Sequence, residues 1–119
     1  VKSRDVIDLC SDPEPTAESA IELDFVPDGA TVVDVRSRAA YAAWHYPGAE
    51  HAEFPAVLAR LDGFDPSRTY VAYCPFGAKS SVLAEALRRR GIEAFSFAGG
   101  TRALMEWAGE HGLDTTPLL

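Results

Sequence analysis

Cys74 is the residue of this sequence best placed to carry out covalent chemistry. The apolar stretch Tyr70–Tyr73 before it predicts a β-strand, and the loop Pro75–Lys79 after it contains a glycine and leads into an amphipathic helix that begins at Ser80. A sulfur at such a position can face backbone NH groups and the positive end of the helix, which stabilise an anion. An ordinary thiol, with a pKa near 8.5, is only about 3 % ionised at pH 7. We therefore predict an activated thiolate at Cys74, and the alternative is a buried cysteine that only packs.

The second cysteine, Cys10, lies in a less reactive setting. It has no glycine-rich loop, helix start or cationic neighbour, so we expect it to pack, although a role as resolving partner for Cys74 stays open. Two cysteines cannot build the disulfide framework of a small secreted protein and are typical of a reducing, cytoplasmic compartment. The cysteines and the three histidines lack the close spacing of metal ligands. We expect no metal and no cofactor.

The hydrophobic pattern alternates between short β-branched runs and helical periods, which predicts an α/β fold with a central parallel β-sheet flanked by helices on both faces. The expected strands are Thr31–Val35, Glu50–Phe54, Tyr70–Tyr73 and Ala94–Phe97, and the expected helices are Arg38–Trp44, Pro55–Leu61, Ser80–Arg90 and Thr101–Glu110. Residues 1–30 are expected to form an N-terminal extension, with a short strand or turn at Val6–Cys10 and a first helix at Ala17–Phe25.

Length and composition set the limits of the interpretation. The 119 residues predict a single domain over 1–119, and 47 % hydrophobic with 24 % charged residues is ordinary for a soluble globular chain. No window approaches the roughly 18 apolar residues of a membrane helix, and no leader pattern is apparent. A formal charge of −7 disfavours attraction to phosphate backbones and anionic lipid. We expect neither nucleic acid nor a membrane as a direct partner of this domain alone.

Five segments together resemble the rhodanese homology domain over residues 31–112, because they occur in its order and spacing. They are Val33–Arg36, Tyr41, His45–Ala49, Tyr73–Ser80 and Phe97–Gly100. The resemblance implies a sulfurtransferase whose loop cysteine, here Cys74, accepts a sulfane sulfur from a donor. The cysteine holds that sulfur as a persulfide and passes it to a nucleophilic acceptor.

The same resemblance implies how the loop would stabilise the charged sulfur. Five backbone amides would form a cradle, namely those of Phe76, Gly77, Ala78, Lys79 and Ser80. Gly77 would adopt a positive φ or approach the sulfur closely. Lys79 would add a cation or point into solvent, and Ser80 would add a hydroxyl donor.

Three other matched residues are expected to support the loop. Asp34 and Arg36 stand at a strand end, where ligands gather in open α/β sheets, and their charges can pair and hold neighbouring turns. His45 could carry protons, but we favour a structural hydrogen bond. Gly99-Gly100 is expected to be a tight turn whose backbone lies close to the Cys74 loop.

Departures from the family pattern restrict the donor. Rhodaneses that use thiosulfate usually carry basic residues at the positions of Pro75, Phe76 and Ala40. We therefore expect thiosulfate to bind poorly. A protein persulfide, such as that of a desulfurase, or another small sulfane-sulfur compound is expected as donor, with a thiol or a protein as acceptor.

Several alternatives remain open at this stage. The segment Cys74–Ser80 and the later Glu93–Gly100 are similar to rhodanese domains of tRNA 4-thiouridine synthases, which relay sulfur to tRNA or to thiamine thiazole synthesis; a free-standing sulfurtransferase explains the same residues. A phosphatase of the related fold would need arginine where Ser80 stands. A catalytically silent interaction module is disfavoured by the presence of Cys74 and Gly77.

Overall fold

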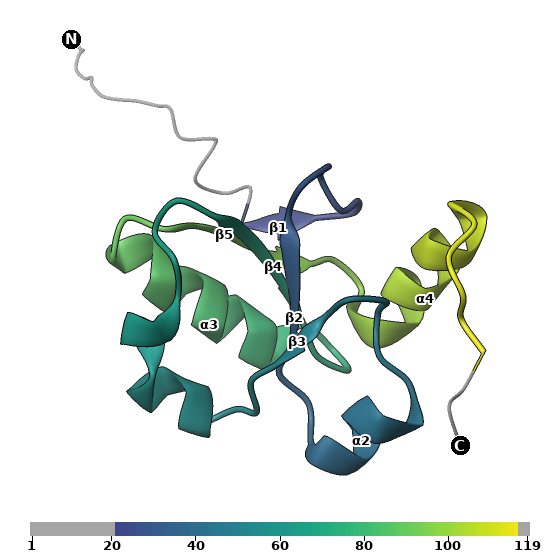
Figure 1. Cartoon of the computed structure of the whole chain (residues 1–119), viewed down its shortest axis with the longest axis horizontal. Coiled ribbons are helices and arrows are strands. Elements are labelled where there is room, and N and C mark those ends of the chain that lie inside the picture. Colours follow the sequence, from purple (N-terminus) through teal and green to yellow (C-terminus); the bar gives the residue numbers. More distant parts are fainter. Residues whose placement is uncertain (1–20, 117–119) are drawn as a thin grey trace, which may run out of the picture.

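A parallel β-sheet forms the centre of the computed structural model, which describes residues 21–116 (Figure 1). Its strands follow the order β1-β5-β4-β2-β3, and every neighbouring pair is parallel. The strands are β1 (Glu22–Leu23), β2 (Thr31–Asp34), β3 (Glu50–His51), β4 (Thr69–Tyr73) and β5 (Glu93–Phe97). The central position of β4 places the residue that follows it, Cys74, at the carboxyl edge of the sheet.

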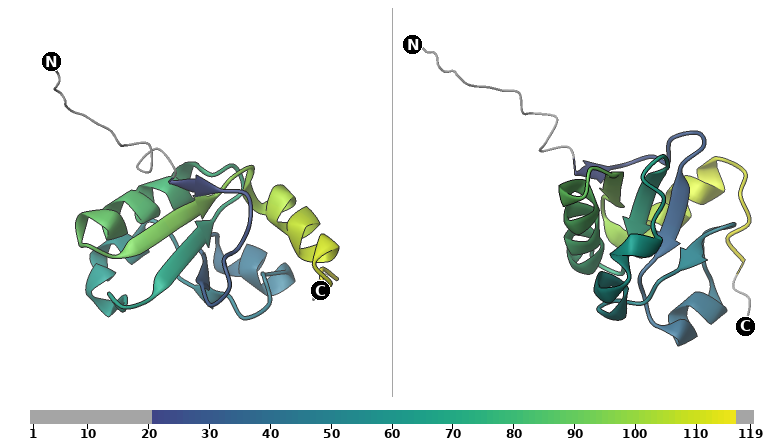
Figure 2. Two further views of the ribbon diagram at one scale, coloured as in Figure 1. Left: turned by 90° about the horizontal axis from the view of Figure 1, so that it is seen from above. Right: turned by 60° about the vertical axis from the view of Figure 1, so that its left-hand side comes forward.

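Helices cover the two faces of this sheet (Figure 2). They are α2 (Arg38–Ala43), the 3-10 turns η1 (Ala56–Ala59) and η2 (Leu61–Gly63), α3 (Ala78–Arg89) and α4 (Gly100–Glu110). The predicted α/β architecture, with a central parallel sheet and helices on both faces, is confirmed. None of the helices in this part of the chain is long and apolar enough to cross a membrane.

The alternation of side chains along β4 divides the core into two layers. Tyr70, Ala72 and Cys74 belong to the cluster that contains Leu83 of α3. Val71 and Tyr73 belong to the opposite cluster, which contains Leu104 of α4 and Trp44. Successive residues of a strand point to opposite faces. Cys74 therefore emerges on the face that α3 covers.

The predicted first helix at Ala17–Phe25 is wrong over the part that the structure describes. Glu22 and Leu23 form strand β1, in register with Ser96 and Phe97 of β5. The amide of Ser96 donates to the carbonyl of Ile21 at 2.7 Å. Pairing with a distant strand satisfies backbone groups here and outweighs a weak local helical pattern, because helices this short are marginal in water. Val6–Cys10 lies outside the described residues.

Three other elements differ from their predicted bounds by more than one residue. Pro55–Leu61 forms 3-10 turns instead of an α-helix, and the strand expected at Glu50–Phe54 shortens to two residues. Helix α3 begins at Ala78, two residues before the predicted Ser80, with Gly77 as its N-cap. The shift of this helix start matters for chemistry, because amides of the N-cap and the first turn of α3 donate to the Cys74 sulfur.

Candidate active site

The thiol of Cys74 lies at the base of the active loop, which we define as residues 74–80. The residue is only 2 % exposed, but two hollows described below reach it. Its sulfur accepts a hydrogen bond from the amide of Gly77 at 3.1 Å and another from the amide of Ser80 at 3.4 Å. Gly77 has a φ of +89°, a conformation that other residues adopt only with strain. This turn aims the NH of Gly77 at the sulfur.

The Ser80 hydroxyl is the third polar contact of the sulfur. Its oxygen lies 3.4 Å from Sγ, 2.7 Å from the Ser96 hydroxyl and 3.2 Å from the Gly77 carbonyl oxygen. Both serines are fully buried. The sequence predicted five backbone amides around the sulfur. In the structure, the amides of Gly77 and Ser80 donate hydrogen bonds to Sγ. Sequence reasoning did not find Ser96, although a serine inside the apolar run of β5 is a visible signal.

The environment of Cys74 lowers the pKa of its thiol below the usual value. Burial opposes ionisation, but the Ser80 hydroxyl, the hydrogen-bonded amides of Ser80 and Gly77 and the neighbouring amide of Lys79 together outweigh it. Donors that point at a sulfur stabilise its charged form. A thiol that ionises more readily is a better nucleophile near neutral pH.

A second backbone segment holds the active loop from the side of α4. The amide of Thr101 donates to the carbonyl of Cys74 at 3.0 Å. A Cβ placed on Gly100 would lie 2.0 Å from the carbonyl oxygen of Pro75, so only glycine fits there. The expected close approach of Gly99-Gly100 to the Cys74 loop is confirmed.

Asp34 and Arg36 form a buried ion pair at the end of β2. Two guanidinium nitrogens bind the Asp34 carboxylate, the shorter contact being 2.7 Å, and the same guanidinium reaches the Trp44 carbonyl. The Tyr73 hydroxyl donates to Asp34 at 2.5 Å. Burial raises the pKa of Tyr73 and Asp34 raises it further, so the hydroxyl stays a donor. These groups fasten β2, β4 and the end of α2 together, and none of them is hydrogen-bonded to the sulfur.

His45 takes part in local packing. Its Nδ1 lies 2.8 Å from the Tyr41 carbonyl oxygen, and its ring stacks on that of Tyr41 with 3.8 Å between ring centroids. It lines a shallow hollow with Trp44 and Pro47, and Cys74 does not line that hollow. The structure therefore places His45 among residues that shape the turn after α2.

Two hollows that share Cys74, Pro75 and Lys79 in their linings reach the active loop. The first, which we call the thiol cavity, has a volume of about 260 Å³ and is lined by Val35, Arg36, Ser37, Ala40, Glu53, Phe54, Cys74, Pro75 and Lys79. The second has a volume of about 230 Å³ and is lined by Cys74, Pro75, Phe76, Ala78 and Lys79. Phe76 is 93 % exposed. Sequence reasoning missed Glu53, because only the fold brings it beside the loop.

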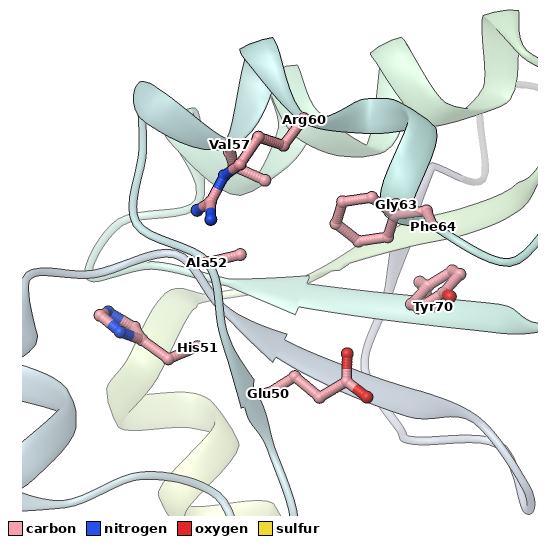
Figure 3. Close-up of a pocket in the computed structure, with 8 residues that line it drawn as sticks. All are labelled: Glu50, His51, Ala52, Val57, Arg60, Gly63, Phe64 and Tyr70. Carbon is pink, nitrogen blue, oxygen red and sulfur yellow. The ribbon is translucent and has the colours of Figure 1, made fainter.

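Figure 3 shows a third hollow, between β3 and the segment that contains Arg60 and Phe64. Its volume is about 280 Å³, and its lining includes Glu50 and His51 of β3, Arg60, and the rings of Phe64 and Tyr70. Cys74 does not contribute to it. The thiol cavity, which contains Cys74, is therefore a better candidate active site than this hollow.

The order and geometry of these elements agree with a known family. Residues 17–106 match the family model of the rhodanese-like domain. The chain belongs to this family. A solved rhodanese-like domain protein from Staphylococcus aureus is 28 % identical with a TM-score of 0.60, covering 76 % of this chain and 84 % of that one. A rhodanese-related protein from Thermoplasma volcanium, 20 % identical, shares the fold with a TM-score of 0.63 and covers 76 % of this chain and 86 % of that one.

Curated relatives of this rhodanese-like domain are named as sulfurtransferases. A tRNA sulfurtransferase from Pyrobaculum aerophilum is 46 % identical over 76 residues, which make up 64 % of this chain but only 16 % of that protein. The thiosulfate sulfurtransferase GlpE from Pseudomonas fluorescens is 36 % identical over 73 residues, 60 % of this chain and 67 % of that protein. Together with the family, these relatives support sulfur transfer in general as the chemistry of the domain.

Proposed function

We propose that this domain accepts a sulfane sulfur on Cys74, holds it as a persulfide and passes it to a nucleophilic acceptor. The observation that carries the proposal is the convergence of the Gly77 amide, the Ser80 amide and the Ser80 hydroxyl on one buried sulfur. A merely packed cysteine has no need of three polar contacts, since it behaves as a small hydrophobe.

The proposed reaction consists of two displacements at sulfur. In the first, the Cys74 thiolate attacks the sulfane sulfur of the donor, the bond between that sulfur and the rest of the donor breaks, and the donor leaves with its electron pair. In the second, an acceptor nucleophile attacks the outer sulfur of the persulfide, and the Cys74 thiolate is the leaving group. Both steps release or consume a thiolate, so groups that stabilise the anion at Cys74 assist the cycle.

The charges around Cys74 disfavour thiosulfate as donor. Two of the three positions that carry basic residues in thiosulfate-using rhodaneses, here Ala40 and Pro75, line the thiol cavity with uncharged side chains. Phe76 occupies the third and lines the neighbouring hollow. A doubly charged anion needs cations to offset its loss of hydration. We infer that the donor is a persulfide, carried by a protein or by a small molecule.

A second candidate function is that of a sulfur-relay domain for tRNA thiolation or thiamine thiazole synthesis. The identity of 46 % to a tRNA sulfurtransferase favours it, although the chain spans about one sixth of that protein's length. In this case other domains would hold the tRNA, and the rhodanese-like domain would deliver sulfur taken from a cysteine desulfurase.

Incubation with a cysteine desulfurase and cysteine tests the proposed function. Mass spectrometry should find one added sulfur on Cys74, absent in Cys74→Ala, retained in Cys10→Ala, and removed by cyanide or dithiothreitol. A small persulfide is then used in place of the desulfurase. Loading by the small persulfide alone would mean that Cys74 accepts sulfur but that the domain does not bind this desulfurase. If Cys74 gains sulfur from neither source, the domain is a silent interaction module and the proposal is overturned.

A further inference from the structure

Two opposite charges in the thiol cavity have no partner within the described residues. Glu53 and Lys79 are both exposed, both line this cavity, and neither side chain forms an ion pair or hydrogen bond, with the other or with any neighbour in residues 21–116. Arg36, the remaining cation of the lining, is held by the buried carboxylate of Asp34. The sulfur of Cys74 therefore shares its cavity with one available anion and one available cation.

The backbone on both sides of the cavity is held in place. The flanking amides of Ala52 and Phe54 donate to the carbonyls of Asp34 and Val35, at 2.9 and 3.1 Å, which fixes the segment after β3 that carries Glu53. Lys79 lies in the first turn of α3, directly before the residue whose amide contacts the sulfur. The two charges are thus presented to the same cavity by two ordered segments.

This arrangement discriminates between donors by their charge pattern. The cavity has a formal charge near zero, because Glu53 balances Lys79 and Asp34 balances Arg36. A donor with a single charge can pair with only one of these two side chains. The other side chain is left without a partner or carries the same charge as the donor. A donor that carries both an ammonium and a carboxylate can pair with both. The volume of about 260 Å³ falls just below the range of drug-sized ligand pockets, about 300–1,000 Å³, and suits a small molecule.

We propose that Glu53 and Lys79 form a two-point site for a small zwitterionic persulfide, an α-amino-acid persulfide, which donates its sulfane sulfur to Cys74. The inference rests on the proposed function and names its donor. The Cys74 thiolate attacks the terminal sulfur of R–S–SH, a new S–S bond forms and the old one breaks. The amino-acid thiolate R–S⁻ leaves and takes the persulfide proton, so the products are R–SH and the Cys74 persulfide anion. No external oxidant or reductant is required.

Three matched donors test the charge pattern. Cysteine persulfide carries both charges, 3-mercaptopropionate persulfide lacks the ammonium, and cysteamine persulfide lacks the carboxylate. Each is mixed with the full chain, and the rate at which Cys74 gains one sulfur is followed by mass spectrometry, with sulfide alone as blank. The variants are Glu53→Gln and Lys79→Gln, and the control is Glu85→Gln on the outer surface of α3. Loading rates are normalised to the rate of Cys74 alkylation, so that a change in thiolate reactivity is not mistaken for a change in donor recognition.

The expected result is that cysteine persulfide loads the natural protein fastest, by about threefold to fivefold, the effect of one partly exposed charge pair. In Glu53→Gln, cysteine persulfide should no longer load Cys74 faster than 3-mercaptopropionate persulfide. In Lys79→Gln, it should no longer load Cys74 faster than cysteamine persulfide. Glu85→Gln should leave both rate ratios unchanged. Equal rates for all three donors, or an equal effect of each substitution on all of them, would overturn the zwitterion site. If the desulfurase still loads Cys74 in that case, the proposed function stands and only its donor is misassigned. If no donor loads Cys74, both fail.

Discussion

Gly100 lies directly against the carbonyl of Pro75, so the turn before α4 and the active loop occupy one continuous packed space. A Cβ at Gly100 would come within 2.0 Å of that oxygen and 3.1 Å of the Cys74 carbonyl oxygen. The neighbouring Thr101 amide binds the Cys74 carbonyl. The position of the sulfur therefore depends on a segment that follows it by more than twenty residues.

Gly100→Ala is expected to displace the active loop and slow the loading of Cys74. Two effects act together, the clash with Pro75 and the strain of a positive φ, which is +79° here. Gly91→Ala is the matched control, because Gly91 has a φ of +80° but open space around its Cβ position. The control should lose about 1–2 kcal/mol of stability from strain alone and keep its loading rate. Urea unfolding and mass spectrometry measure the two quantities, and equal loading by both variants would contradict the packing argument.

Ser80→Ala should raise the pKa of Cys74, because it removes the hydroxyl contact while keeping the amide of residue 80. A hydrogen bond of about 1 kcal/mol corresponds to roughly a fivefold change in equilibrium, so alkylation near neutral pH should slow several-fold. Iodoacetamide rates measured against pH should show the profile moving to higher pH. Ser81→Ala, in the same helical turn but without a contact to Sγ, should match the natural protein. An unchanged profile in Ser80→Ala would show that the backbone amides alone set the ionisation.

The lowered pKa of Cys74 also predicts a pH dependence of stability. The folded thiol ionises at lower pH than the unfolded thiol, so ionisation adds to the free energy of unfolding. That contribution is complete above the unfolded pKa, near 8.5, and disappears as the pH falls through the folded value. Unfolding free energies of the reduced natural protein should therefore exceed those of Cys74→Ser by a margin that grows as the pH rises. A margin that stays constant from neutral to alkaline pH would argue against an activated thiol.

Tyr73→Phe should destabilise the domain while leaving the chemistry of the thiol largely intact. The Tyr73 hydroxyl donates to buried Asp34 and accepts from the amide of Tyr46 at 3.1 Å, so its removal leaves buried polar groups short of a partner. The expected loss is about 1–3 kcal/mol. Tyr41→Phe is the control, because its hydroxyl makes one hydrogen bond, to the Ala49 carbonyl, at a less buried site. Urea denaturation gives the comparison, and a larger loss in Tyr41→Phe would contradict this account of the network.

Basic residues in the two hollows around Cys74 should create thiosulfate activity. We would combine three substitutions in one variant, Ala40→Arg, Pro75→Arg and Phe76→Lys, which places three cations around the sulfur. Its turnover of thiosulfate, measured as thiocyanate formed with cyanide, should be at least about tenfold higher than that of the natural protein. That factor corresponds to about 1.4 kcal/mol, the range of one or two well-placed ion pairs. Ala59→Arg adds one of these charges outside the cavity and should have no effect. A comparable rise in the control would mean that net charge, rather than the cavity, governs the anion.

Sequence reasoning could propose the loop around Cys74 as the candidate site because the features it used are local. Cys74, Gly77 and the start of α3 lie within a few residues of one another, and their types imply a strand end, a positive φ and a helix start. Ser96 and Glu53 escaped it, since each reaches the loop only through the pairing of strands far apart in the chain. Strand β1 was mistaken for a helix for the same reason: its two residues acquire their conformation from β5.

The near-complete burial of the Cys74 sulfur has a consequence for the fate of the atom it would carry. An added sulfur, about 2 Å further out, would project into the cavity and become the part that an incoming nucleophile meets first. Attack on that outer atom hands it over, whereas attack on the inner one would expel sulfide and leave the protein tied up in a mixed disulfide. Burial of the inner sulfur therefore favours attack on the outer sulfur, so that the sulfur is transferred to the acceptor and is not released as sulfide.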